Sequence, residues 1–566
     1  MSDNQLAVEV VRGEMQPWSD YSGKRGAVGG PVLRALLTDV LPAGARTLIV
    51  GPHAADLVAV AVEKASTATM LVRSVSDAAA LAEQFPDLQV IAGALDGLAG
   101  TTYETVVAVD GLDRVLGYDS DDLTWPERLD ALAALCTPET VLLLGLENEF
   151  ALTSLLDRRP PLDRHGDDEW RPLHDDPARP VSAVQLASEL ARVGLPLQSV
   201  YASFSDKTLL AVDVAAAARP GTLPTRLAIE ALESTDVPLL APIAEAAETA
   251  SRAGLLVSTS TGWLAATGAP VEHAVYSSTG PAVLTADQTS TGWSTTAVAS
   301  EAPTVAPRST HLSARHVSFD ASAVPAEVSG GVSVETLLFR YAAAEDVPAF
   351  RELAARLGEW ALAQTNQVVL RWDDIVVDGD SFGFGVSGWI ADANRTELLA
   401  AAWQRFHTRL IGNHRRHPWP PWMIGDDLVT AWLAMSGAPD EQIAQGKEIA
   451  AALAAVLGTV ETPAPDVRTA LADAERAKHE LFELQGHVFG LERTLGFRDK
   501  ALKTRETRLR ELRLQVQKAN AERTRFRNSR AFAVTTVIRK AALIRNPRKF
   551  AYKVKRRLKK KLGNRF

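Results

Sequence analysis

The sequence predicts an α/β protein whose open parallel sheet ends in an antiparallel hairpin, followed by an α+β region and a long helical coiled coil. Three observations predict this organisation. Short β-rich runs alternate with helical stretches between residues 29 and 217, apolar residues repeat in heptads between residues 467 and 519, and 17 Lys or Arg without any Asp or Glu fill residues 523–566. The expected divisions are an extension at 1–28, an α/β domain at 29–217, an α+β domain at 218–460, a linker at 461–466, a coiled coil at 467–522 and a basic amphipathic tail at 523–566.

Composition narrows the class of protein. A chain of 566 residues is too long for one hydrophobic core, and 46% hydrophobic with 23% charged residues is typical of globular domains. The single cysteine, Cys136, excludes an internal disulfide and a Cys-rich zinc site, and no metal centre is expected. Because the sequence contains neither a signal peptide nor an apolar run of 18 residues, we expect a cytoplasmic protein.

Five β-rich runs in the first domain predict five parallel strands, since helical stretches separate them. Two further runs, 197–204 and 209–212, are joined by a short polar turn and predict an antiparallel hairpin at the end of the domain. The five runs are residues 47–50, 68–72, 88–92, 105–109 and 140–144.

Three stretches of this domain carry a family resemblance: TLIVG at 47–51, TYETVVAVDGLDRV at 102–115 and LPLQSVYASFSDKTLLAV at 195–212. They resemble the first strand with its Gly-rich turn, the fourth strand and the terminal hairpin of the class I S-adenosylmethionine-dependent methyltransferases. The resemblance implies an S-adenosylmethionine site at the carboxyl ends of the strands. The residues that it places there are Gly51, His53, Asp56, Asp96 and Asp110.

The sequence also departs from that family. Arg73 stands where a carboxylate is expected to hold the ribose, Ala94 stands near the expected adenine-binding acid, and Pro52 removes a backbone donor from the first turn. A cation in place of the carboxylate removes two hydrogen-bond acceptors. Two interpretations remain open: a methyltransferase with an altered cofactor site, or a domain that keeps the fold without the cofactor. The acids at 147 and 149 could serve an acceptor substrate or begin the next helix.

Residues 218–460 predict short antiparallel strands between Trp263 and Val298, two helices within 334–362, and a hairpin in VVLRWDDIVVDGDSFGFGVSGW at 368–389. This order resembles the aminoglycoside phosphotransferase type of kinase fold. The resemblance places Asp374 at a metal-binding Asn and Val386 at a metal-binding Asp, so kinase activity is not expected. The hairpin acids are expected in turns and at the surface; they are Asp373, Asp374, Asp378 and Asp380.

The heptad pattern of residues 467–519 predicts a coiled coil and therefore a homo-oligomer, because a partner helix is needed to cover so long an apolar seam. Two core positions hold Arg498 and Arg505, which are polar breaks of the kind that set register. A single amphipathic helix folded onto the body is the alternative. The large apolar residues expected at the oligomer interface are Leu481, Leu484, Val488, Leu491, Leu495, Leu502, Leu509, Leu512 and Val516.

The tail combines cations with apolar residues at helical spacing, which favours an anionic membrane surface as partner. A solvated basic end is the alternative, and nucleic acid is less expected because no base-reading module is recognisable. We therefore expect peripheral attachment to the inner face of the cell membrane. The cations expected to contact it are Arg539, Lys540, Arg548, Lys549, Lys553, Lys555, Arg556, Arg557, Lys559, Lys560 and Lys561.

The order of these parts resembles that of the bifunctional methyltransferase-kinases that terminate O-antigen polysaccharide chains at bacterial inner membranes. The resemblance implies a role in the assembly or modification of a cell-surface polysaccharide. A second hypothesis makes both heads non-catalytic and the protein a scaffold that recruits glycan-assembly enzymes to the membrane.

Overall fold

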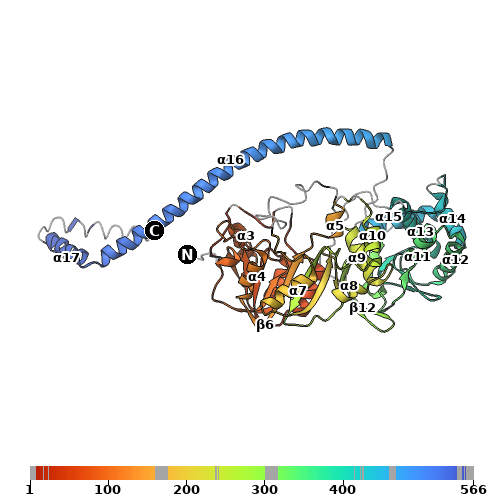
Figure 1. Ribbon diagram of the computed structural model, residues 1–566, viewed down its shortest axis with the longest axis horizontal. Coiled ribbons are helices and arrows are strands. Elements are labelled where there is room, and N and C mark those ends of the chain that lie inside the picture. Colours follow the sequence, from red (N-terminus) through yellow and green to blue (C-terminus); the bar gives the residue numbers. More distant parts are fainter. Residues whose placement is uncertain are drawn as a thin grey trace. The chain divides into compact units, whose positions relative to one another are not determined.

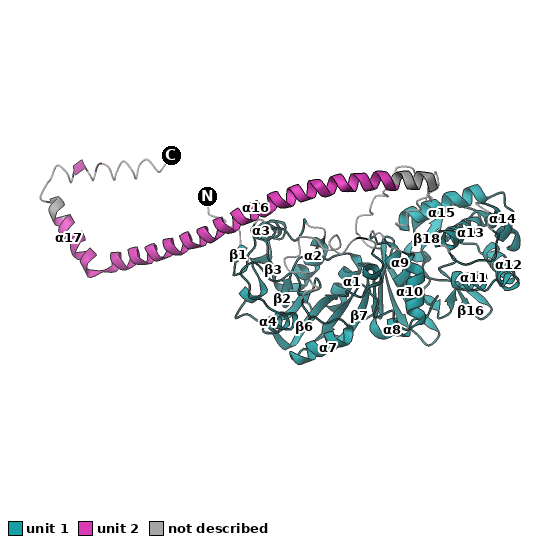
Figure 2. Cartoon of the chain, turned by 45° about the horizontal axis from the view of Figure 1, so that its top comes forward, with its two compact units in different colours: residues 1–461 teal, residues 462–566 magenta. Residues whose placement is uncertain are grey.

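The computed structural model describes residues 8–16, 18–22, 25–157, 159, 176–235, 237, 239, 241–299, 317–413, 415–420, 422–423, 426–457, 467–544, 551–552 and 555. The chain forms two compact units, residues 1–461 and 462–566, which Figure 2 distinguishes by colour. The boundary between them falls at the edge of the linker expected at 461–466.

Among the described residues, one sheet of 13 strands runs through most of the first unit (Figure 1). Its first six strands are parallel, and the others pair antiparallel with their neighbours. The five parallel strands expected from the sequence are confirmed, and β1 adds a sixth. In spatial order the strands are β1 (Val8–Val10), β4 (Leu88–Ala92), β3 (Ala65–Val72), β2 (Ala45–Val50), β5 (Tyr103–Ala108), β6 (Cys136–Glu147), β9 (Gly262–Thr267), β7 (Leu197–Phe204), β8 (Thr208–Ala211), β10 (Val275–Thr279), β11 (Ala282–Gln288), β12 (Gly292–Ala299) and β14 (Glu327–Ser329).

The expected hairpin is confirmed, since β7 and β8 pair antiparallel from Tyr201 opposite Ala211 to Phe204 opposite Thr208. It does not close the parallel sheet, however, because β9 lies between β6 and β7 and pairs antiparallel with both. The antiparallel strands expected between Trp263 and Val298 are present as β9 to β12, and they extend this same sheet. A single sheet therefore crosses residues 217–218, where the sequence analysis places a domain boundary.

Helices cover both faces of the parallel part of the sheet. Alternate residues of a strand face opposite sides, so Leu48 and Val50 join one core while Ile49 joins the other. The core around Ile49 includes helices α1 (Pro31–Val40), α2 (Ala55–Lys64) and α3 (Val75–Gln84). The core around Leu48 includes α4 (Trp125–Ala133), α7 (Ala183–Arg192), α9 (Leu223–Glu233) and α10 (Ile243–Arg252). Burial on both faces explains the continuous apolar runs of these strands.

A third core lies within residues 334–453 and contains the aromatic side chains of Phe350, Trp403, Phe406 and Trp432, whose rings meet in tilted or edge-on pairs. The two helices and the hairpin expected here are confirmed. The kinase resemblance stays a prediction. The helices are α11 (Val334–Ala343), α12 (Val347–Ala363), α13 (Arg395–Gly412), α14 (Asp426–Met435) and α15 (Ile443–Leu457), and the small sheets contain β15 (Val332–Ser333), β16 (Ile375–Asp378) and β17 (Ser381–Phe384), and β13 (Val317–Phe319) with β18 (Trp389–Ala391).

Two of the four hairpin acids are not surface residues, which corrects the expectation. Asp374 is buried and accepts the backbone N–H groups of Val386 at 3.0 Å and Ser387 at 2.8 Å. Asp373 accepts hydrogen bonds from Arg371 at 2.8 Å and Arg405 at 3.1 Å. Two arginines distant in sequence lie against these carboxylates, Arg405 at 3.1 Å from Asp373 and Arg226 at 3.3 Å from Asp374, and the local turn pattern does not reveal these partners. Asp378 and Asp380 are exposed, as expected.

The described part of the second unit contains α16 (Val467–Asn528), a single helix of 62 residues, and α17 (Arg530–Ile544). The nine apolar residues expected at an oligomer interface lie on α16 and are between 37% and 61% exposed. Arg539 and Lys540 lie on α17, and Lys555 is described. The other predicted membrane contacts, Arg548, Lys549, Lys553, Arg556, Arg557, Lys559, Lys560 and Lys561, lie outside the described residues. Over the part of the chain that the structure describes, none of the helices has the length and apolar content of a membrane span.

Candidate functional site

The candidate site lies at the carboxyl ends of β2 and β5, which are neighbours in the sheet. The chain leaves β2 toward β3 on one side and β5 toward β6 on the other, so the strand order reverses between them. Open α/β sheets bind ligands at such a reversal. Gly51 follows β2 with a φ of +87°, a conformation that glycine adopts without strain, and a Cβ there would lie 3.6 Å from Asp110 Oδ2.

His53 is a structural residue under this site. Its Nε2 accepts the backbone N–H of Val109 at 3.2 Å, so Nδ1 carries the proton and donates to the carbonyl of Gly51 at 3.1 Å. The side chain is fully buried, and burial lowers the pKa of the imidazole. A neutral, doubly hydrogen-bonded ring fixes the turn and leaves no ring nitrogen for a ligand.

Asp110 is held by Arg114, four residues further along the chain. The guanidinium donates to both carboxylate oxygens, at 2.9 Å from Nε and 2.5 Å from Nη2. The same guanidinium donates to the backbone carbonyls of Asp20, Arg25 and Gly26. Asp110 and Arg114 therefore tie the end of β5 to the chain that precedes α1.

Arg73, at the end of β3, forms a second buried pair with that same part of the chain. Its Nε donates to Asp20 Oδ2 at 3.1 Å, its Nη2 donates to the other oxygen of Asp20, and its Nη1 donates to the carbonyl of Leu116 at 3.2 Å. The side chains of Arg73 and Asp20 are only 2% and 1% exposed. Each of the three guanidinium nitrogens of Arg73 therefore donates a hydrogen bond within the fold.

Asp96 lies beyond β4, in the short helix Leu95–Gly97. Its two oxygens accept the Ser120 hydroxyl at 2.9 Å and the Asp121 N–H at 3.2 Å, and Arg12 lies 3.8 Å away. These contacts join the loop after β5 to the chain before α1. Asp96 holds protein groups at the position where the resemblance implies an adenine.

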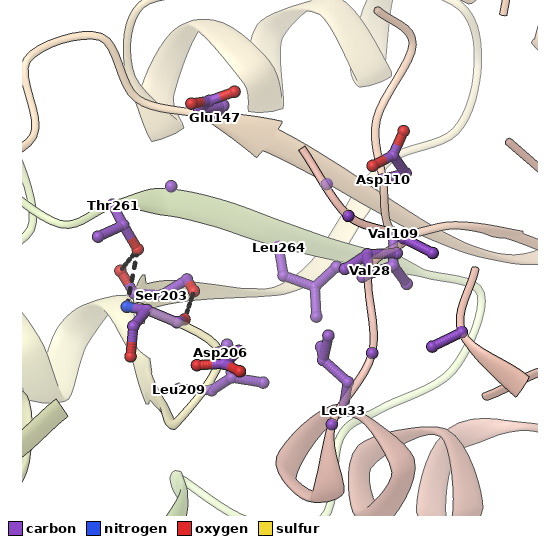
Figure 3. A pocket seen from close by; sticks show the side chains of 18 of the residues that line it. Val28, Leu33, Val109, Asp110, Glu147, Ser203, Asp206, Leu209, Thr261 and Leu264 are labelled. Carbon is purple, nitrogen blue, oxygen red and sulfur yellow. Dashed lines mark hydrogen bonds between the residues drawn. The ribbon is translucent and has the colours of Figure 1, made fainter. Parts of the chain in front are cut away.

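A cavity of about 630 Å³ opens beside Asp110, on the side toward β6 and β9. Four carboxylates line it, those of Asp56, Asp110, Glu147 and Asp206; Figure 3 shows the last three around an apolar floor that includes Leu33 and Leu264. Asp56 accepts the backbone N–H of Gly30 at 3.1 Å, and Glu147 pairs with Arg25 at 3.1 Å. Glu147 ends β6 and faces this cavity instead of beginning a helix.

The structure therefore brings together two of the five predicted cofactor residues, Asp56 and Asp110, as cavity-lining side chains. Gly51, His53 and Asp96 are not among the lining residues. Sequence reasoning missed the contribution of β7, of the turn after it and of the start of β9, which supply Ser203, Asp206, and Thr261 with Trp263. The Ser-Asp-Lys turn at 205–207 was a usable signal for Asp206, but the pairing of β9 is long-range.

The described conformation does not fit S-adenosylmethionine on the side of β3 and β4. The position expected for a ribose-binding carboxylate carries the buried Arg73, and Asp20 fills the space in front of it. Gly93, which follows β4, is packed so closely that an added Cβ would overlap Val11. The residues on the side of β3 and β4 therefore do not fit the nucleoside of this cofactor in the described conformation.

No family model matches the chain, and no curated protein matches it. Solved structures with a similar fold include a complex of the Haloferax volcanii Trm112 methyltransferase activator with a methyltransferase, at 13% identity and a TM-score of 0.26, covering 42% of this chain and 89% of that one. Another is the phosphoethanolamine N-methyltransferase 2 of Haemonchus contortus in complex with phosphomonomethylethanolamine and S-adenosylhomocysteine, at 11% identity and a TM-score of 0.26, covering 43% of this chain and 54% of that one. A third is the [4+2]-cyclase SpnF, at 16% identity and a TM-score of 0.24, covering 42% and 80%.

The class assignment rests on the chain's own topology. Parallel strands in the order β4-β3-β2-β5-β6, with antiparallel strands beyond β6 and helices on both faces, form a Rossmann-like sheet of the class I methyltransferase type.

Proposed function

We propose that this chain is a membrane-associated, oligomeric scaffold whose methyltransferase-like head acts without cofactor chemistry in the assembly or modification of a cell-surface polysaccharide. The observation that carries the proposal is the second unit. A helix of 62 residues presents an exposed apolar seam and is followed by α17, which begins the basic tail.

The seam supports oligomerisation because exposed leucines at heptad spacing gain a buried environment only against another helix. Leu495 and Leu502 occupy successive a positions, and Leu491 occupies the d position before them. A second copy of this chain is the partner that presents the same seam. At about 1.5 Å per residue, the helix itself is roughly 90 Å long.

The tail supports membrane attachment through charge and apolar content together. Val534, Val537 and Ile538 of α17 are exposed, and 17 cations without any acid fill residues 523–566. Each cation near an anionic bilayer contributes roughly 1 kcal/mol, so several acting together give stable binding. The polysaccharide role rests on the resemblance in domain order alone.

Sedimentation of the full chain with lipid vesicles tests the proposal. We expect binding to vesicles that contain phosphatidylglycerol, no binding to pure phosphatidylcholine, and release at 0.5 M salt, because salt screens the attraction. Changing Lys553, Lys555 and Lys559 to Gln should weaken the binding. The matched control changes Arg493, Lys500 and Lys518 of α16 to Gln and should bind normally. Equal binding to both kinds of vesicle would rule out the electrostatic attachment.

A methyltransferase head is the second candidate. Asp110 and the cavity beside it favour this alternative, because a concave site with several polar groups at the carboxyl edge of the sheet is a normal place for a substrate. Binding of S-adenosylhomocysteine to the full chain distinguishes the two candidates.

A further inference from the structure

The chain before α1 crosses the carboxyl ends of four neighbouring strands. We call the described residues 8–16, 18–22 and 25–28 the N-terminal segment. It contacts the turn or loop that follows β4, β3, β2 and β5 in succession. The contacts are Ala94 N–H to Arg12 O at 2.9 Å, Met15 N–H to Arg73 O at 2.8 Å, Val28 N–H to Pro52 O at 3.2 Å, and Arg114 Nη1 to Asp20 O at 3.3 Å.

Asp20 is the anchor of this segment. Besides the bidentate bond from Arg73, its carboxylate accepts the indole N–H of Trp18 at 3.1 Å, and the Arg73 guanidinium lies 5.5 Å from the centre of the Trp18 ring. The backbone N–H of Asp20 donates to Asp77 at 2.8 Å. Such a buried, fully hydrogen-bonded pair holds its two chain segments together, because separating the partners leaves a charge without compensation.

The close packing of two glycines against the N-terminal segment is independent evidence that the segment belongs to the fold at this position. An added Cβ on Gly117 would overlap the carbonyl oxygen of Gly13, and one on Gly97 would lie 2.7 Å from the carbonyl oxygen of Arg12. Met15 is completely buried. The backbone of the N-terminal segment therefore packs directly against the backbone of the loops that follow β4 and β5.

We infer that the N-terminal segment is a built-in occupant of the crevice in which an open α/β sheet binds a nucleoside, with Arg73 as its anchoring cation. Arg73 then has a function of its own and is not a damaged ribose ligand. The N-terminal segment occupies the place of a cofactor nucleoside in the head. The cavity beside Asp110 is an open part of the same carboxyl edge of the sheet. The inference goes beyond the proposed function, since vesicle binding neither requires nor excludes it.

The two interpretations of Arg73 predict opposite results for one substitution. If Arg73 has only replaced a ribose-binding carboxylate and has no role of its own, Arg73→Asp would restore that carboxylate and recover affinity for S-adenosylhomocysteine. If Arg73 anchors the segment, Arg73→Asp places two buried carboxylates against each other. The variant then loses stability and gains no affinity.

The first experiment is calorimetric titration of the full chain with S-adenosylhomocysteine up to millimolar concentration, together with urea unfolding. We expect no binding heat for the wild type, for Arg73→Asp or for the exchanged pair Asp20→Arg with Arg73→Asp. We expect a large loss of urea midpoint for the single variant and recovery of most of it in the exchanged pair. Binding by the wild type or by Arg73→Asp would overturn the inference, and so would an exchanged pair no more stable than the single variant.

The matched control is the ion pair Arg12–Asp121 in the same segment, whose side chains are 48% and 70% exposed. Arg12→Asp should leave the urea midpoint close to that of the wild type, because an exposed pair contributes little. A loss equal to that of Arg73→Asp would mean that any charge change in the segment is harmful, and would overturn the role of Asp20–Arg73 as anchor.

Hydrogen exchange on the wild type keeps the inference testable even if Arg73→Asp does not fold. The amides of Met15 and Asp20 donate to Arg73 and Asp77, so peptides that contain them should exchange as slowly as peptides of β2 and β3. Exchange at the rate of an unstructured chain would overturn the inference. Adding S-adenosylhomocysteine should change neither rate.

Discussion

His53 and Val109 are joined by a hydrogen bond from the backbone amide of Val109 to Nε2 of the imidazole, at 3.2 Å. The bond requires the unprotonated nitrogen, and burial also lowers the pKa of the ring from its ordinary 6.5. The folded protein therefore holds this histidine neutral at pH values where the unfolded chain takes up a proton.

Stability should consequently fall as pH falls through about 6.5. The unfolded state binds the extra proton below this pH, so between pH 7.5 and 5.5 His53 alone removes up to about 1.4 kcal/mol from the free energy of unfolding. Urea unfolding at both pH values measures the loss, which should be smaller in His53→Gln. The exposed His487→Gln should keep the full dependence; an unchanged dependence in His53→Gln would show that another group is responsible.

Asp374→Ala should destabilise the first unit strongly. The carboxylate accepts two backbone N–H groups and lies 3.3 Å from Arg226, and both side chains are 9% exposed. Its removal leaves a buried cation and two buried donors without this partner, at a cost of roughly 3 kcal/mol or more. Asp380→Ala, in the exposed turn of the same hairpin, is the control for urea unfolding and should leave the midpoint unchanged. Equal effects would contradict the structural role of Asp374.

Gly117→Ala should disturb the contact between the N-terminal segment and the loop after β5. The new methyl group would overlap the carbonyl oxygen of Gly13, and overpacking of this kind costs roughly 1–3 kcal/mol. Limited proteolysis should then cut within residues 8–22 faster than in the wild type. Gly383→Ala, where an added Cβ meets nothing within 4 Å, should show the wild-type pattern.

Replacing Arg498 and Arg505 by Leu should stabilise the oligomer. Both arginines occupy d positions of the proposed seam, and each leucine buried there adds roughly 1–3 kcal/mol per chain. Thermal unfolding followed at the helical signal, at a fixed chain concentration, measures the gain. Arg493→Leu, outside the seam at an f position, is the control. A gain from Arg493→Leu alone would mean that the register is misassigned.

The strands and hairpins could be predicted because apolar runs and turn residues are signals carried by the element's own stretch of sequence. The runs around Leu48, Met70, Val90, Val106 and Leu142 are apolar and bounded by helices, and all became central strands. The hairpin of β16 and β17 followed from its Gly379-Asp380 turn, where Gly379 has a φ of +59°.

The partners of those elements could not be predicted in the same way. Nothing within Gly262–Thr267 indicates that this strand inserts beside β6, and nothing next to Asp20 indicates that it meets Arg73. Both are contacts between distant parts of the chain, whereas periodicity reports only neighbours in sequence. The candidate site was therefore predicted only in part: Asp56 and Asp110 line the cavity, while the residues from β7 to β9 were missed.

The insertion of β9 has a consequence for synthesis of the chain. While the ribosome adds residues in order, β6 and the β7–β8 hairpin emerge before the strand that joins them. A nascent chain that ends before Thr267 exposes the edge of β6, and unpaired edges of this kind promote aggregation. Joining of the β7–β8 hairpin to the parallel strands is therefore delayed until the segment after α10 has been translated, and translation pauses before that point should lower the yield of folded protein.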